Sequence, residues 1–155
     1  MRQFADLDEI SRDILKEIGN IGTGNAVTAL SQMLMHPVDI AVPDLKILKY
    51  QEVCSLLDSA DELQTGIMVG VGGEMEGMFL FLLSETFTMM VLNKILGEEE
   101  REFLNPGEME RSLICELGNI MCGSYINALA SVMDLKLEVS VPDVCIDMGL
   151  SLIHI

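Results

Sequence analysis

A glutamate followed three residues later by an asparagine occurs twice in this chain, as Glu17 with Asn20 and as Glu116 with Asn119. Both pairs lie in the same sequence, Glu-x-Gly-Asn-Ile. A carboxamide does not titrate, so it serves as neither acid nor base, but it can orient a water through its carbonyl oxygen and its NH2 group. A positioned water matters most where the electrophile is already activated, as in phosphoryl transfer. Residues of these types could therefore serve that kind of hydrolysis.

The rest of the sequence offers little catalytic machinery. It has no Walker-type loop, metal-ligand cluster or activated nucleophile, and GNIGTG is a weak match to a phosphate-binding loop. His36 and His154 are too few and too far apart for a zinc site. A hydrolytic reaction would therefore take its metal and its electrophile from another molecule. The alternative is structural: each Glu and Asn merely pairs with backbone groups inside the fold.

Both pairs belong to an internal repeat. Residues 13–45 align without a gap with residues 112–144, and ten of the 33 aligned positions are identical. The identities include Glu, Asn, Gly and Pro, whereas unrelated helices would more readily share Leu and Ile, so the pattern indicates duplication. We expect a single domain over residues 1–155, made of two repeats at about 6–97 and 105–155, the second incomplete.

A long helix over about residues 6–34 is expected to position the first pair. Its apolar residues recur at three- and four-residue spacing and predict one buried stripe: Leu7, Ile10, Ile14, Ile18 and Ile21. Asp13, Glu17 and Asn20 fall within an arc of about 60° along the edge of that stripe. A second long helix carries Ser112, Glu116 and Asn119 at the same spacing. We expect Asn105 to cap it, with Pro106 as its first residue and Glu108 completing a capping box.

Shorter elements connect the two helices. We expect strands over 38–42 and 136–141, each ending at a proline, and a short helix over 50–62. Segments 64–72 and 75–83 predict a hairpin around Gly72 and Gly73. Ser84 is expected to cap a further helix that reaches about Leu96.

Charge and composition restrict the partners. The formal net charge of −16 argues against nucleic acids and anionic membranes. No apolar run approaches the roughly 18 residues of a membrane span, and MRQFADLDEI lacks the apolar stretch of a signal peptide. The four cysteines show no Cys-x-x-Cys spacing and are expected to be buried free thiols. We therefore expect a cytoplasmic protein with no nucleic-acid partner and no membrane insertion.

The spacing Asp/Ser-x3-Glu-x2-Asn-x22-Pro resembles the signature of the CheC, CheX and FliY family of chemotaxis phosphatases. Two copies match it in full: Asp13, Glu17, Asn20 and Pro43, then Ser112, Glu116, Asn119 and Pro142. The resemblance covers essentially the whole chain. With two signatures, the chain is more similar to CheC than to CheX, which carries one. The lack of an added FliN-like domain favours CheC over FliY.

The resemblance implies hydrolysis of the aspartyl-phosphate of the response regulator CheY. Asn20 and Asn119 would each place a water in line with the phosphorus, while Glu17 and Glu116 would hold a basic residue of CheY. No cofactor of the chain's own is expected, because the Mg²⁺ would belong to CheY. The first and last signature positions would have supporting roles: Asp13, Ser112, Pro43 and Pro142.

The resemblance also implies a second partner, the receptor deamidase CheD. Members of the family bind it through a short helix after the second signature proline. Here that helix would cover residues 143–149, with Asp147 as the contact. The alternative function is a catalytically weak or inactive scaffold that binds CheD or resembles the flagellar switch. Burial of either Glu/Asn pair would exclude that pair as a phosphatase site.

The expected fold is α/β (α+β): an internally duplicated CheC-like domain with two long helices packed on an antiparallel or mixed sheet. Strands from both repeats would join in that sheet. The first repeat continues for some 60 residues past Pro43, but only 13 residues follow Pro142. We therefore expect a truncated C-terminal repeat with exposed sheet edges, which favours a segment-swapped oligomer.

Overall fold

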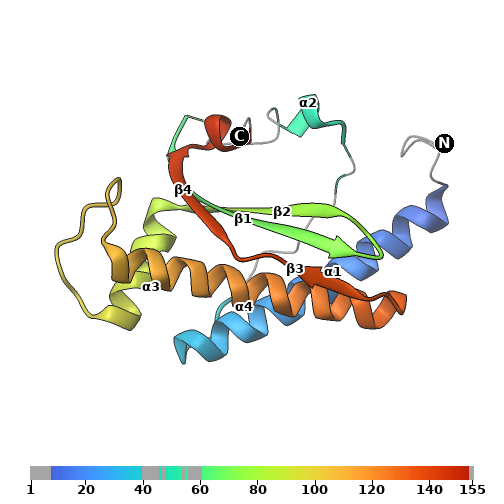
Figure 1. Cartoon of the computed structure of the whole chain (residues 1–155), viewed down its shortest axis with the longest axis horizontal. Coiled ribbons are helices and arrows are strands. Elements are labelled where there is room, and N and C mark those ends of the chain that lie inside the picture. The colour runs from blue at the N-terminus through green and yellow to red at the C-terminus, as the bar shows by residue number, and fades with distance from the viewer. Residues whose placement is uncertain (1–7, 40–45, 47, 54, 56–60, 154–155) are drawn as a thin grey trace.

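Figure 1 shows the computed structural model of the chain, which describes residues 8–39, 46, 48–53, 55 and 61–153. The described helices are α1 (Glu9–Leu34), α2 (Tyr50–Val53), α3 (Glu85–Leu96), α4 (Glu108–Met133) and α5 (Gly149–Ile153). The described strands are β1 (Leu63–Gly73), β2 (Gly77–Ser84), β3 (Leu137–Val139) and β4 (Asp143–Met148). This mixture of helices with one antiparallel sheet confirms the expected fold class.

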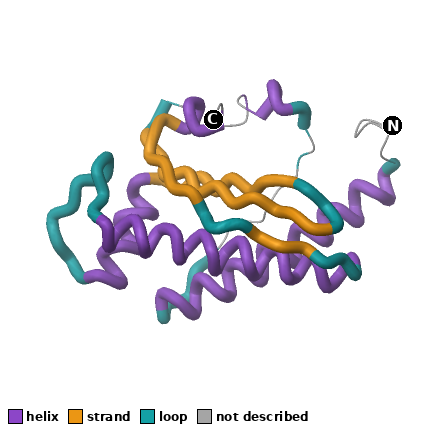
Figure 2. Tube along the Cα trace, viewed as in Figure 1, coloured by secondary structure: helices purple, strands orange, loops and turns teal. Residues whose placement is uncertain are grey.

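Both repeats contribute strands to the sheet, as predicted. The long strand β1 is central: β2 pairs with one of its edges, and β3 and β4 pair with the other, all antiparallel. Gly118 of α4 contacts Ile67 of β1, whereas Leu152 of α5 contacts the neighbouring Gly66. Because successive residues of a strand point to opposite faces, α4 and α5 cover opposite faces of the sheet. Figure 2 shows the strands between these two helical layers.

The two long helices show the duplication in three dimensions. Each is 26 residues long, and each ends in a residue with left-handed backbone, Met35 after α1 and Asp134 after α4. They lie side by side and run in opposite directions (Figure 1). α4 contacts both the sheet and α1, whereas the main contact of α1 is α4 itself.

By length and composition alone, α4 passes the test for a membrane-crossing helix, with a mean hydropathy of 1.2. Only 28% of that stretch is buried, but part of its apolar surface has another explanation in this fold, because it packs on the sheet and on α1. Ile114, Leu117, Cys122 and Ile126 all lie in the hydrophobic core, together with Ile67 and Val69 of β1.

The predicted buried stripe of α1 is wrong. Ile10 and Ile14 are 71% and 54% exposed, and Ile18 and Ile21 are only half-buried, while Leu7 lies outside the described residues. The opposite face is buried instead, and it consists largely of small residues followed by leucines: Gly19, Gly22, Ala26, Leu30 and Leu34.

Close approach of α4 explains why the small-residue face is the buried one. A Cβ at Gly22 would come within 2.7 Å of Cε2 of Tyr125, so the absence of a side chain there admits the tyrosine ring. Tyr125 also makes an edge-on contact with Phe79 of β2, with ring centroids 5.0 Å apart. The large side chain of Tyr125 of α4 therefore packs on the small-residue face of α1 and holds the two helices together.

The hairpin of β1 and β2 is confirmed, but its turn is not where it was predicted. The strands pair from Gln64 with Ser84 to Val71 with Gly77, so the turn lies at 74–76. Gly73 instead extends β1 and pairs with β3. It has a φ of +106°, and a Cβ there would meet the carbonyl oxygen of Lys136. The approach of β3 therefore requires this glycine.

The predicted helix starts had different outcomes. Ser84 caps α3 as expected, because its Oγ accepts a hydrogen bond from the N–H of Phe87 at 3.2 Å. The capping box of α4 is wrong, since Gly107 is the N-cap and makes no side-chain bond. The N–H of Asn105 donates to the carbonyl oxygen of Glu102 in a turn, which keeps Asn105 outside the helix.

Three other predicted elements differ from the structure. α2 is only four residues long, and residues 61 and 62 are not helical. Val38 and Asp39 are not in a strand, and 40–42 lie outside the described residues. The predicted strand over 136–141 is reduced to β3.

The helix expected over 143–149 is wrong, because residues 143–148 form β4. Along this strand Val144 and Ile146 pair with Ile67 and Thr65 of β1 and are partly buried, whereas Asp143 and Cys145 are exposed. This alternation of buried and exposed side chains has the period of two that a strand requires.

Candidate functional site

Both Glu/Asn pairs lie on exposed surfaces of the two long helices. Glu17 and Asn20 of α1 are exposed, as are Glu116 and Asn119 of α4. Around each helix, the glutamate and the asparagine are about 60° apart, with the glutamate on the side opposite the buried residues and the asparagine at the edge of that side. Two equivalent polar sites therefore face away from the core, and neither is lost to burial.

These four side chains are not tied into the fold. Within the described residues, none of them makes a hydrogen bond or an ion pair. Asn25 of the same helix behaves differently, because its Nδ2 donates to the carbonyl oxygen of Ile21 at 2.8 Å. The structural alternative, in which each pair satisfies backbone groups inside the fold, is therefore contradicted. The free amides and carboxylates remain available to another molecule.

The glycine that precedes Asn119 fixes the position of its helix. A Cβ at Gly118 would meet Cγ2 of Ile67 and would lie 3.4 and 3.5 Å from Cβ and Cγ of Pro142. Gly118 therefore lets α4 sit directly on β1 and on the signature proline. Because Gly118 faces the sheet, Glu116 lies about 160° away from the sheet side of the helix and Asn119 about 100° away from it.

Pro142 is buried against α4 and so has a clear place in the site. Its ring contacts Gly118, and its carbonyl oxygen accepts a 3.9 Å hydrogen bond from Sγ of Cys115. The 22-residue gap in the signature thus joins the middle of the long helix to the segment between β3 and β4. Pro43, its counterpart in the first repeat, lies outside the described residues.

The other predicted site residues are placed as follows. Asp13 and Ser112 are exposed, one turn before Glu17 and Glu116. Asp147 lies in β4, where its carboxylate accepts bonds from the N–H of Met148 at 2.7 Å and from Oγ of Ser151 at 3.1 Å. It thus supports the start of α5, and its contact with CheD stays a prediction.

Hydrogen bonding or burial shifts the pKa of three described groups, Asp8, Cys122 and Tyr125. The hydrogen bonds from Ser11 lower the pKa of Asp8, the N-cap of α1. Burial raises the pKa of the Cys122 thiol and of the Tyr125 hydroxyl. The described cysteines are free thiols, as predicted, but Cys145 is exposed rather than buried. No cluster of His, Cys, Asp or Glu in the described part of the chain could hold a metal ion.

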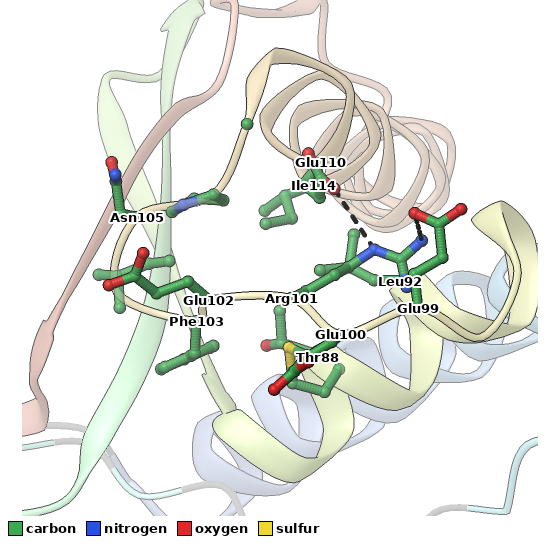
Figure 3. A pocket seen from close by; sticks show the side chains of 14 residues that line it. Thr88, Leu92, Glu99, Glu100, Arg101, Glu102, Phe103, Asn105, Glu110 and Ile114 are labelled. Atoms are coloured by element: carbon green, nitrogen blue, oxygen red, sulfur yellow. Dashed lines mark hydrogen bonds and ion pairs between the residues drawn. The ribbon is translucent and has the colours of Figure 1, made fainter.

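A cavity of about 200 Å³ lies elsewhere, between α3, the connector 97–107 and the first turns of α4 (Figure 3). The side chain of Arg101 is 6% exposed there. Its guanidinium pairs with Glu110 at 3.3 Å and donates to the carbonyl oxygen of Gly97 at 2.8 Å and to the side chain of Asn93. Arg101 therefore joins the end of α3 to the start of α4, a role that the acidic sequence around it did not suggest.

Comparison with known proteins places the two sites in a family. The model of the CheC-like family matches residues 10–47 and 109–146, two stretches that begin 99 residues apart, as the internal repeats do. The chain is 34% identical over 150 residues to the CheY-P phosphatase CheC of Bacillus subtilis, covering 96% of this chain and 72% of that one. It is 29% identical to the flagellar motor switch phosphatase FliY of Bacillus subtilis, covering 90% of this chain and 36% of FliY.

Solved structures agree on the fold. The crystal structure of Thermotoga maritima FliY superimposes with a TM-score of 0.75 at 26% identity, covering 93% of this chain and 72% of that one. The chemotaxis protein CheX of Vibrio vulnificus has a TM-score of 0.64 at 17% identity, covering 86% of this chain and 80% of that one. The second likeness concerns the fold alone.

Proposed function

This chain belongs to the CheC-like family, and from that premise we propose that it is a phosphatase that hydrolyses the aspartyl-phosphate of the response regulator CheY. Two relatives are named as phosphatases, one a CheY-P phosphatase and the other a flagellar motor switch phosphatase. The observation that carries the proposal is that both Glu/Asn pairs are exposed and have no hydrogen-bond or ion-pair partner among the described residues.

The two asparagines are the catalytic residues of the proposal. Once a helix docks over the phosphorylated aspartate, the carboxamide of Asn20 or Asn119 accepts a hydrogen bond from a water and holds it in line with the phosphorus. Positioning of this kind converts an encounter with bulk water into a step within one complex. Phosphoryl transfer depends almost entirely on such positioning and on electrostatic stabilisation. An amide therefore suffices where no base is present.

The two glutamates fix the docked partner. Glu17 and Glu116 lie one turn before their asparagines on the same exposed face, so a basic residue of CheY can pair with the carboxylate while the amide enters the active site. On this proposal, the Mg²⁺ that would neutralise the phosphoryl oxygens belongs to CheY. Gly118 and Pro142 support the second site by holding α4 against the sheet.

The decay of phosphorylated CheY tests the proposal. The chain should accelerate that decay, Asn20→Ala and Asn119→Ala should each remove part of the acceleration, and the double variant should remove all of it. Asn25→Ala is a matched control, because Asn25 is an exposed asparagine of α1 whose amide already bonds to its own helix. Binding of phosphorylated CheY with an unchanged lifetime would favour the scaffold alternative instead.

Two further parts of the proposal concern other partners. CheD binding remains possible to test through Asp147→Ala, although Asp147 stands in a strand and not in the helix that was expected. A segment-swapped oligomer is a second prediction, which the mass of the particle in solution tests directly. Neither part is needed for the phosphatase reaction.

A further inference from the structure

An exposed apolar side chain stands at the same place in both long helices. Ile10 is the second residue of α1 and is 71% exposed, and Met109 is the second residue of α4 and is 68% exposed. The two positions are 99 residues apart, the offset of the internal repeat, and each follows an exposed glutamate, Glu9 or Glu108. The duplication therefore includes an apolar residue that the fold itself does not bury.

Each of these side chains lies on the same face as the proposed site. Seven residues separate Ile10 from Glu17 and Met109 from Glu116, which corresponds to about 20° around the helix and about 10 Å along it. The apolar residue and the glutamate thus follow one line along the helix, and the asparagine lies about 60° to one side of it. The three residues span roughly 15 Å, a length that a single docked domain can cover. Solitary exposed apolar residues need no explanation. Two that are equivalent by duplication and aligned with equivalent polar sites do.

We propose that Ile10 and Met109 are docking residues, each of which inserts into an apolar depression on the phosphorylated response regulator beside the basic residue that pairs with Glu17 or Glu116. The inference rests on the proposed function and adds the chemistry of the recognised surface. An apolar side chain at one end of the line supplies affinity, because its burial removes hydrocarbon surface from water. The glutamate supplies orientation, and the asparagine supplies the reaction.

Binding to the beryllofluoride-activated CheY protein of Bacillus subtilis provides the test, because this form keeps its phosphate analogue and separates binding from hydrolysis. Ile10→Ser is made in the Glu116→Lys background, and Met109→Ser in the Glu17→Lys background. Reversal of the charge that pairs with the basic residue of the partner weakens docking at the other helix, so each titration reports mainly on one helix. We expect each serine variant to raise the dissociation constant by about three- to tenfold, since most of one large apolar side chain is lost from the interface.

Matched controls come from α3, which carries no Glu/Asn pair. Ile95→Ser and Met90→Ser remove the same side chains from exposed positions on that helix. Both controls should leave the dissociation constant unchanged. Ile10→Ser and Met109→Ser should also keep the wild-type thermal midpoint, because these two side chains are 71% and 68% exposed.

The outcomes separate this inference from the proposed function. If Ile10→Ser and Met109→Ser bind as tightly as the α3 controls while the wild type accelerates phosphate loss, the docking role is overturned and the phosphatase proposal stands. If the serine variants bind more weakly but the wild type leaves the phosphate lifetime unchanged, the docking role stands and the phosphatase proposal fails. An absence of binding by the wild type overturns both.

Discussion

Gly118 is the position where the structure makes its most quantitative prediction. Replacement by alanine places a Cβ against Cγ2 of Ile67, which is fully buried, and at 3.4 Å from Cβ of Pro142. Neither neighbour is the free end of a flexible side chain. Overpacking of this kind costs about 1–3 kcal/mol, whereas the exchange of glycine for alanine inside a helix gains about 1 kcal/mol.

Gly123 of the same helix supplies the matched control. Nothing lies within 4 Å of a Cβ placed there, so Gly123→Ala gains the stability that comes from the higher helix propensity of alanine without overpacking. Because the gain in helix propensity is common to both variants, the difference between their free energies of unfolding isolates the contact with the sheet. We expect Gly118→Ala to be less stable than Gly123→Ala by about 1–3 kcal/mol.

Urea unfolding, with equal slopes for the two variants, measures that difference. If the two alanine variants are equally stable within about 0.5 kcal/mol, α4 is not held directly on β1 and Pro142. The explanation of how the signature glycine and proline position Asn119 would then be wrong. Gly118→Ala should also lower the phosphatase activity of the second site, since a shift of about 1 Å at a catalytic group can cost 100-fold.

Three further predictions concern stability. Met35→Gly should raise the free energy of unfolding by about 0.5–1 kcal/mol, because Met35 has a φ of 51° and buries little; thermal midpoints check this, and a fall would contradict it. Arg101→Ala should cost about 3 kcal/mol, since it leaves the partly buried Glu110 without its cation; a loss below about 1 kcal/mol would show that the connector does not depend on this pair. Burial raises the pKa of the Cys122 thiol, so its contribution to stability is present below the ordinary cysteine pKa of about 8.5 and is lost as the pH rises above it. The difference in unfolding free energy between the wild type and Cys122→Ala should therefore shrink between about pH 8 and 10, and a constant difference would refute the assignment.

The polar residues of the site could be predicted from the sequence, because they recur at a fixed spacing in both repeats. A duplicated Glu, Gly and Asn within a helical segment predicts a repeated surface whatever the packing around it, and both pairs are indeed exposed. The buried face of α1 was not accessible in the same way. Hydrophobic periodicity weighs Ile10 and Ile14 as core residues and gives Gly22 no weight, yet Tyr125 packs on the glycine and leaves the isoleucines outside.

The errors near the C-terminal repeat have a similar physical origin. The alternation in 143–148 was visible in the sequence, but only the pairing with β1 decides that this segment is a strand. The N-cap of α4 depends on a turn closed by Glu102 and Asn105, a contact that local propensity does not specify. Long-range backbone pairing and turn geometry, rather than residue type, decided both cases.

The central claim is that the two asparagine amides perform the reaction rather than merely hold the partner. The most direct measurement compares the rate at which phosphorylated CheY loses its phosphate in the presence of the wild type and of the Asn20→Ala/Asn119→Ala double variant, each added at a concentration that saturates CheY. Binding of both proteins to the beryllofluoride form of CheY is measured in parallel. We predict binding close to that of the wild type and a catalysed rate at least about 100-fold lower, at the spontaneous rate of phosphate loss. A double variant that still accelerates phosphate loss at saturation would contradict the claim.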